Sequence, residues 1–216
     1  RQLKKQDLEP LSDLERVQYI KELIDGFDND SELKRFKGEV YYDLQHLARL
    51  FSDMKREAWD PAVLLQKIDH YIQVTVPENY TNKRSKEVKL TADGQKQIEK
   101  MLKSKAAIEA FTTYQSILAA RNRYDFDDMI NWVIRLFEDH PDVLLGYQEQ
   151  LQYILVDEYQ DTSGSQNKIV QMLSSYWEDN PNLFVVGDDD QSIYRFQGAN
   201  VENMMAIRTR LEKNLK

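Results

Sequence analysis

The sequence has no cysteine among its 216 residues, and this absence removes several classes of protein from consideration. Without thiols the chain can form neither disulfides nor thiolate metal sites. No apolar run approaches the roughly 20 residues that a membrane-spanning helix needs, and no signal peptide is recognisable. We therefore expect a cytoplasmic protein with no membrane partner.

Positive charge is also scarce, because 29 lysines and arginines face 37 acidic residues and leave a formal net charge of −8. A dominant nucleic-acid-binding surface normally carries an excess of positive charge. Any such surface must here be a local groove or patch. A lysine-rich stretch at residues 83–105 is either a contact for DNA or a solvated helix face, and the sequence leaves both open.

Two short apolar runs end abruptly in acidic residues. Residues 153–156 precede Asp157 and Glu158, and residues 183–186 precede a glycine and three aspartates at 187–190. Runs of this length predict buried strands of a parallel sheet. Ligands bind at the carboxyl ends of such strands in open α/β sheets. The arrangement suits Mg²⁺-nucleotide hydrolysis, in which one carboxylate holds the metal and its neighbour orients or deprotonates the attacking water.

The first 150 residues have the patterns of helices. Ser12 followed by Glu15 predicts a capping box, and Asp60 before Pro61 predicts an N-cap with a first-turn proline. Asp125 predicts a further N-cap. The Asp-Phe-Asp-Asp run at 125–128 then has two interpretations that stay open: helix capping with acids in the first turn, or a role in shaping a path for DNA.

Helical periodicity also predicts one long helix over about 91–122, with a loop at 76–82 before it. Strands are predicted only at about 152–157 and 182–187, with a helix between them. The pattern as a whole predicts an α/β fold that is predominantly helical.

Two long motifs carry a specific resemblance. Residues 157–162 (Asp-Glu-Tyr-Gln-Asp-Thr) and 186–199 (Val-Gly-Asp-Asp-Asp-Gln-Ser-Ile-Tyr-Arg-Phe-Gln-Gly-Ala) closely resemble motifs II and III of the UvrD/Rep/PcrA helicases of superfamily I. Residues 124–130 resemble the segment that precedes motif II in this family. The resemblance is specific from about residue 110 to 205. It implies an ATP-dependent DNA translocase that unwinds duplexes, moves 3′ to 5′ on single-stranded DNA, and uses ATP and Mg²⁺.

One family motif is missing. The Walker A loop, Gly-x-x-x-x-Gly-Lys-Ser/Thr, supplies clustered backbone N–H groups and a lysine to the phosphates. None of the seven glycines here precedes Lys-Ser or Lys-Thr. We therefore expect a piece of a longer helicase, whose partners include the missing Walker A segment and a second RecA-like domain of the same polypeptide. The piece alone should not hydrolyse ATP.

The resemblance assigns roles to residues of motif II. It implies that Asp157 binds Mg²⁺ and that Glu158 is the catalytic base. Gln160 and Asp161 belong to the part of the motif that connects the ATP site with neighbouring motifs, so Gln160 is a candidate nucleotide-site residue. Asp161 could instead cap a helix that begins near Ser163. Gln166 either matches a family position or is an ordinary surface glutamine.

Motif III has its own candidates. Gln191 resembles the glutamine that senses the γ-phosphate, and its amide can donate to a phosphate oxygen. Tyr194 and Phe196 face the same way in an extended segment, which suits stacking on bases of single-stranded DNA, although two core aromatics would have the same spacing. Arg195 could bind a phosphate or a nearby carboxylate. Gln197 stands where the family commonly has arginine, and Phe196 where it commonly has tryptophan.

The resemblance also divides the chain. Residues 1–122 resemble the helical insertion subdomain, and residues 123–216 resemble the carboxyl-terminal half of the first RecA-like motor domain, a partial P-loop NTPase sheet. A different class, a non-catalytic helical module that binds DNA or protein, stays open for the chain on its own. A calcium loop at 188–190 lacks the necessary glycine and glutamate. A two-metal nuclease site is a further conceivable arrangement, built from Asp125, Asp127, Asp157 and Asp188.

Overall fold

The computed structural model describes residues 8–29, 31–34, 38–81, 89–177 and 182–188. The chain forms two compact units. We name the first the helical unit, residues 7–51 and 59–124, and the second the α/β unit, residues 1–6, 52–58 and 125–216. No helix in the described ranges is long and apolar enough to span a membrane.

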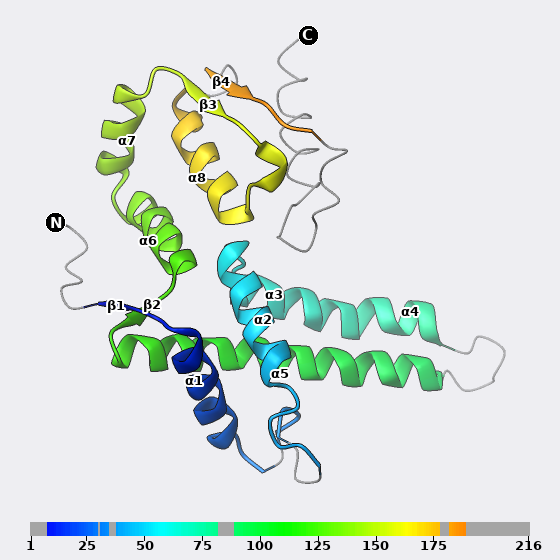
Figure 1. Cartoon of the computed structure of the whole chain (residues 1–216). Helices are drawn as coiled ribbons and strands as arrows, with labels where there is room; N and C mark the ends of the chain where they lie inside the picture. The colour runs from blue at the N-terminus through cyan, green and yellow to red at the C-terminus, as the bar shows by residue number, and fades with distance from the viewer. Residues whose placement is uncertain (1–7, 30, 35–37, 82–88, 178–181, 189–216) are drawn as a thin grey trace. The chain divides into compact units, whose positions relative to one another are not determined.

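The helical unit is built around its longest helix, α5 (Ala92–Ala120). Helix α1 (Asp13–Asp25) packs against α5. Helix α3 (Pro61–His70), the π-helical turn η1 (Tyr71–Thr75) and α4 (Val76–Tyr80) follow one another directly and lie alongside α5 (Figure 1). A short parallel pair, β1 (Glu9–Pro10) with β2 (Arg123–Tyr124), joins the beginning and the end of the unit.

The core of the helical unit is apolar and aromatic. Phe51 stacks on Tyr114 with ring centroids 4.9 Å apart. The side chains that close this core come from α1, α2 (Leu44–Arg56) and α5, and they include Ile20, Leu23, Ile24, Leu44, Leu47, Phe51, Tyr114 and Leu118. Burial of so many aliphatic and aromatic side chains stabilises the unit by roughly 1.5–3 kcal/mol for each one.

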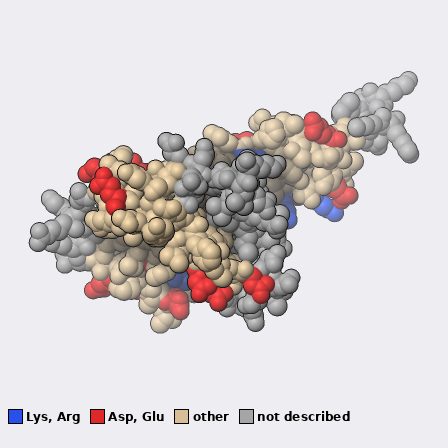
Figure 2. Space-filling view, turned by 90° about the horizontal axis from the view of Figure 1, so that it is seen from above, with Lys and Arg blue, Asp and Glu red and all other residues tan. Residues whose placement is uncertain are grey.

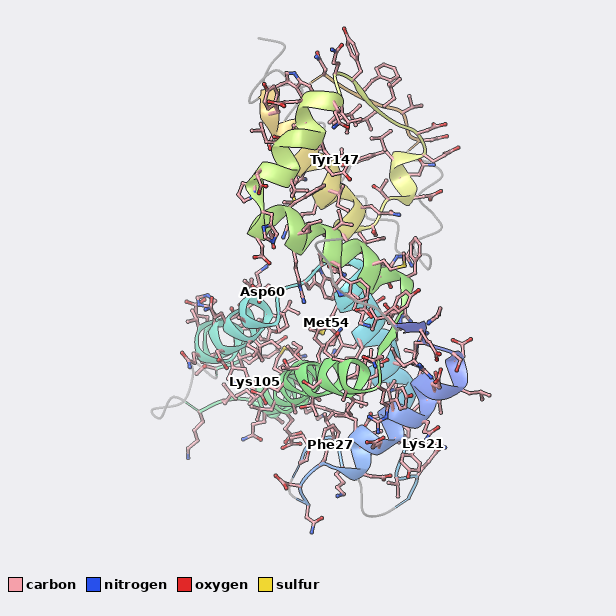
Figure 3. The ribbon with its side chains drawn as sticks, turned by 90° about the vertical axis from the view of Figure 1, so that its left-hand side faces the viewer. Lys21, Phe27, Met54, Asp60, Lys105 and Tyr147 are labelled. Atoms are coloured by element: carbon pink, nitrogen blue, oxygen red, sulfur yellow. The ribbon has the colours of Figure 1, made fainter. Side chains whose placement is uncertain are left out.

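Three predicted caps are confirmed. Ser12 and Glu15 form a capping box at α1, and the Asp60 carboxylate accepts from Ala62 N at 2.8 Å ahead of Pro61 in α3 (Figure 3). Asp125 caps α6 (Phe126–Asp139). The predicted long helix is confirmed as α5.

Two predictions are wrong. Residues 76–80, predicted as part of a loop, form α4, because Val76 is fully buried and the segment packs against α5. Strands were predicted only near 152–157 and 182–187, but β1 and β2 also pair. Two residues per strand are too few to show a periodicity of two.

The α/β unit contains a β-α-β arrangement. Strand β3 (Ile154–Val156) is followed by the 3₁₀ turn η2 (Tyr159–Asp161), helix α8 (Gly164–Ser174), the 3₁₀ turn η3 (Ser175–Trp177) and strand β4 (Leu183–Val185). The two strands are parallel, with Leu155 opposite Phe184. Helices α6 and α7 (Pro141–Gln150) pack with α8 (Figure 1). A predominantly helical α/β chain with a small parallel sheet is therefore confirmed.

The prediction that both strands are buried is wrong, because one face of the strand pair is exposed. Leu155 is 75% exposed and Phe184 is 63% exposed, while their neighbours on each strand are half-buried. A single crossover helix can cover only one face of a strand pair. The other face presents an apolar surface.

Candidate active site at the ends of two parallel strands

The register of β3 and β4 places the ends of the two acidic motifs side by side. Pairing continues past the strands, since Val186 N donates to Val156 O at 2.8 Å and Tyr159 N donates to Val186 O at 3.0 Å. Asp157 and Glu158 leave β3 at the edge where Gly187 and Asp188 leave β4. The sequence prediction that both motifs meet at the carboxyl ends of parallel strands is confirmed for residues up to Asp188.

Asp157 and Glu158 are both exposed at this edge. The Asp157 carboxylate accepts from Glu158 N at 2.9 Å. Glu158 has φ 49° and ψ 44°, the left-handed region, which costs a non-glycine residue about 1–2 kcal/mol. Strained backbone of this kind persists where surrounding contacts enforce it, and it is frequent at functional sites.

Gln160 supplies a side-chain contact beside this strained residue. Its side chain is almost fully buried; Nε2 donates to Glu158 Oε2 at 2.5 Å, and Oε1 accepts from Asp188 N at 3.0 Å. A Cβ atom at Gly187 would come within 2.9 Å of Gln160 Oε1, so glycine leaves the room this bridge needs. The amide of Gln160 thus joins the two motifs. From the sequence, Gln160 could be identified only as part of a segment that connects the ATP site with neighbouring motifs.

Tyr159 anchors the turn between β3 and α8. Its ring is buried and its hydroxyl donates to Asn167 Oδ1 in α8. Burial raises the pKa of Tyr159 to about 12. Thr162 Oγ1 donates to Tyr159 O at 2.7 Å, so the turn is held at both of its ends.

Helix α8 begins with a capping box made by Ser163 and Gln166. Ser163 Oγ accepts from Gln166 N, and Gln166 Oε1 accepts from Ser163 N at 3.0 Å. Asp161 is therefore not the helix cap that one interpretation predicted; it lies within η2 and is exposed. Gln166 is exposed, as a surface glutamine would be, and its side chain completes the cap.

Asp125 and Asp128 begin α6 with a reciprocal cap, and both also bind Lys55 from α2. Lys55 Nζ lies 2.7 Å from Asp125 Oδ2 and 2.8 Å from Asp128 Oδ2, with the lysine side chain only 3% exposed. Burial raises the pKa of each carboxyl and the Lys55 ammonium lowers it. The net pKa of Asp125 lies below its ordinary value, and that of Asp128 lies above it. The capping interpretation of the Asp-Phe-Asp-Asp run is confirmed.

The exposed carboxylate at the strand ends is of the kind that would suit Mg²⁺. Mg²⁺ usually takes one or two protein carboxylates and completes its shell with waters and phosphate oxygens. Asp157 offers an exposed carboxylate of this kind. In the described part of the chain no three or more histidines or acidic residues gather to hold a metal by themselves. That observation, with Asp125 engaged by Lys55, contradicts the two-metal nuclease arrangement.

Four site residues predicted from motif III lie outside the described residues. They are Gln191, Tyr194, Arg195 and Phe196.

Two lysines of the lysine-rich stretch form ion pairs within the helical unit. Lys103 Nζ lies 2.7 Å from both carboxylate oxygens of Asp43, and Lys105 Nζ lies 2.7 Å from Asp69 Oδ1. Among the described residues, basic side chains form small separate areas on the face drawn in Figure 2, and acidic ones are more widespread. For the part of the stretch that lies in α5, these contacts favour the interpretation as a helix face; residues 83–88 lie outside the described residues.

Comparison with known proteins shows the family of the chain. The model of the UvrD/REP helicase N-terminal domain matches residues 2–212. The chain belongs to this family. It is 48% identical over 97 residues to the ATP-dependent DNA helicase PcrA of Leuconostoc citreum, covering 45% of the chain and 13% of that protein. With PcrA of Staphylococcus aureus (strain Mu50) it shares 43% identity over 121 residues, covering 56% of the chain and 16% of the relative.

A third relative, PcrA of Bacillus subtilis (strain 168), is 45% identical over 99 residues, which is 46% of the chain and 13% of that protein. The matched region thus spans less than a fifth of the length of each of these UvrD/REP-family relatives.

Proposed function

We propose that this chain supplies the hydrolytic carboxylates and the motif II to motif III connection of an ATP-dependent DNA helicase. The observation that carries the proposal is the bridge at the strand ends, where Gln160 joins Glu158 to the backbone of Asp188. The family membership and the names of the PcrA relatives support the substrates, ATP and DNA.

The proposed chemistry divides between neighbouring residues. Asp157 would hold Mg²⁺, and the ion would neutralise charge on the nucleotide phosphates. Glu158 accepts a proton from the attacking water, and the hydrogen bond from Gln160 limits the orientations of its carboxylate. Asp188 begins the segment that leads to Gln191, so a displacement there reaches Glu158 through one side chain.

The remaining roles follow the family pattern. Gln191 senses the γ-phosphate, Tyr194 and Phe196 stack on single-stranded DNA, and Arg195 binds a phosphate or a carboxylate. Residues 1–122, which contain most of the helical unit, form the insertion subdomain, and residues 123–216 form the carboxyl-terminal half of the first RecA-like motor domain. Residues 52–58 lie in the first segment but group with the α/β unit. Movement is 3′ to 5′. Turnover needs a Walker A segment and a second motor domain.

Substitution of the base tests this function. In the complete helicase polypeptide that carries this chain, Glu158→Gln should retain ATP binding and lower kcat by about 10²–10⁴-fold, because the amide cannot accept the proton. The 216-residue chain alone should show no Mg²⁺-dependent, DNA-stimulated turnover. Near-normal hydrolysis by Glu158→Gln would place the base elsewhere. Binding of DNA or protein without any turnover by the complete polypeptide would favour the non-catalytic helical module.

A further inference from the structure

The carboxyl-terminal end of α2 belongs to the α/β unit, although the rest of the helix belongs to the helical unit. Three contacts within the α/β unit hold this end. Lys55 Nζ binds Asp125 and Asp128, and Lys55 O accepts from Asn131 Nδ2 at 2.7 Å. Because both the side chain and the backbone of Lys55 are bound, the position of Glu57, two residues further on, is closely defined.

Glu57 in turn contacts the start of α8. Its Oε2 accepts from Gly164 N at 3.0 Å. Gly164 is the first residue of α8, where backbone N–H groups lack partners within the helix and a negative charge is favoured. The approach is close: a Cβ at Gly164 would lie 2.8 Å from Glu57 O and 3.1 Å from Glu57 Cα. The backbones of the two segments touch here, and only glycine leaves room.

From α8 the contacts lead back to the catalytic carboxylate. Asn167, in the first turn of α8, accepts the hydroxyl hydrogen of Tyr159. Tyr159 adjoins Gln160, whose amide donates to Glu158. A shift of the start of α8 would therefore move the turn that holds Glu158 in its left-handed conformation.

We propose that Glu57 is a positioning residue for Glu158, acting through the first turn of α8 and the turn at Tyr159–Asp161. The inference rests on the proposed function, since it assigns Glu57 to the same hydrolytic site. Sequence reasoning had no signal for it, because Glu57 and Gly164 are 107 residues apart in the chain.

Four variants test the proposal. Glu57→Ala removes the acceptor, and Glu57→Gln keeps an oxygen that can accept from Gly164 N. Gly164→Ala disturbs the same contact from the other side. Gly146→Ala in α7 is the matched control, because a Cβ there meets no atom within 4 Å.

The first readout is amide hydrogen exchange of residues 159–167 in the 216-residue chain. Glu57→Ala and Gly164→Ala should accelerate exchange there by about 3–10-fold, the loss of one hydrogen bond, while Glu57→Gln and Gly146→Ala leave it near the unsubstituted rate. The second readout is steady-state ATP hydrolysis by the complete helicase. Glu57→Ala should lower kcat by about 10–10²-fold with KM for ATP unchanged, and Glu57→Gln should restore it.

Unchanged exchange at 159–167 in Glu57→Ala would overturn the proposal. Full turnover by Glu57→Ala, in a helicase whose unsubstituted form hydrolyses ATP, would also overturn the role of Glu57. That result would leave the proposed function of the site unaffected. Absence of turnover by the unsubstituted complete helicase would instead sink the proposed function, and this inference with it.

Discussion

Gln160 Nε2 lies 2.5 Å from Glu158 Oε2, so the buried amide of one residue holds the exposed carboxylate of another two positions earlier. The same amide accepts from Asp188 N through its oxygen. A glutamate in place of Gln160 would bring a second carboxylate against Glu158, and the two negative charges would repel each other. Glutamine is the residue type that can donate to one motif and accept from the other.

Removal of this amide should destabilise the chain. Gln160→Ala removes a buried side chain together with its hydrogen bonds to Glu158 and to Asp188 N, and we expect the free energy of unfolding to fall by about 1–3 kcal/mol. Urea denaturation followed by tryptophan fluorescence measures it. The exposed Gln171 of α8 provides the control, since Gln171→Ala should change stability by no more than about 0.5 kcal/mol. Equal stabilities of the two variants would contradict a structural role for the bridge.

Substitution of the buried Lys55 should lower the free energy of unfolding more than substitution of Gln160. Lys55→Met leaves two aspartates without their cation in a site where Asp128 is 7% exposed, and we expect a loss of about 3–5 kcal/mol. The measurement is again the urea midpoint. Lys67→Met, on the exposed face of α3, should have little effect. A loss below about 1 kcal/mol for Lys55→Met would mean that Asp125 and Asp128 are satisfied by solvent.

Acid should weaken the capping box of α1. Hydrogen bonds from the Ser12 backbone and from Arg123 lower the pKa of Glu15 from 4.5 to about 2. A depressed pKa in the folded chain means that the stabilisation is fully present above pH 4.5 and is lost as the pH falls toward 2. Urea midpoints measured between pH 6 and pH 2 should fall through this window. Glu15→Gln should remove this part of the pH dependence; an identical acid limb in the variant would assign it to other carboxylates.

The exposed face of the strand pair should promote association. Leu155 and Phe184 lie opposite each other and expose most of their apolar surface. Within the described residues β3 and β4 pair only with each other, and a strand edge left unpaired beside such a face invites pairing with another chain. We expect concentration-dependent self-association in sedimentation velocity, reduced by Leu155→Lys combined with Phe184→Lys. Leu14→Lys, at an isolated residue of α1 that is 84% exposed, should leave it unchanged. A monomer at all concentrations would show that the face is satisfied within one chain.

Local chemistry was predictable from the sequence, and long-range contacts were not. The cap at Ser12 depends on four consecutive residues, so it could be recognised without knowing the fold. The helix at 76–80 was missed because its stabilisation comes from packing of Val76 rather than from any local signal. The cap of α8 was assigned to Asp161 as one alternative although Ser163 had the better pattern, with Gln166 three residues on.

At the candidate site, too, local features could be predicted from the sequence and long-range contacts could not. The position of Asp157 and Glu158 at the end of a strand followed from an apolar run that ends in acids. The partners of Lys55 are 70 and 73 residues away, and the sequence between them contains two complete helices and the long α5. No periodicity or spacing rule connects residues at such distances, so a buried lysine could not be distinguished from a solvated one.

The bound end of α2 also has a consequence for the order of folding during synthesis. The segment Ser52–Ala58 is made early, but its partners in α6 begin at Asp125 and its partner in α8 is Gly164. At about 5–20 residues per second, Gly164 leaves the ribosome roughly 5–20 s after Glu57. The contacts of Lys55 with Asp125 and Asp128 can form only after 70–73 further residues are made, and the contact of Glu57 with Gly164 only after 107. The helical unit already has every residue of its own core once Leu118 is synthesised. The helical unit should therefore fold first, and Asp157 and Glu158 acquire their fixed geometry only when the last part of the chain contacts a segment made long before.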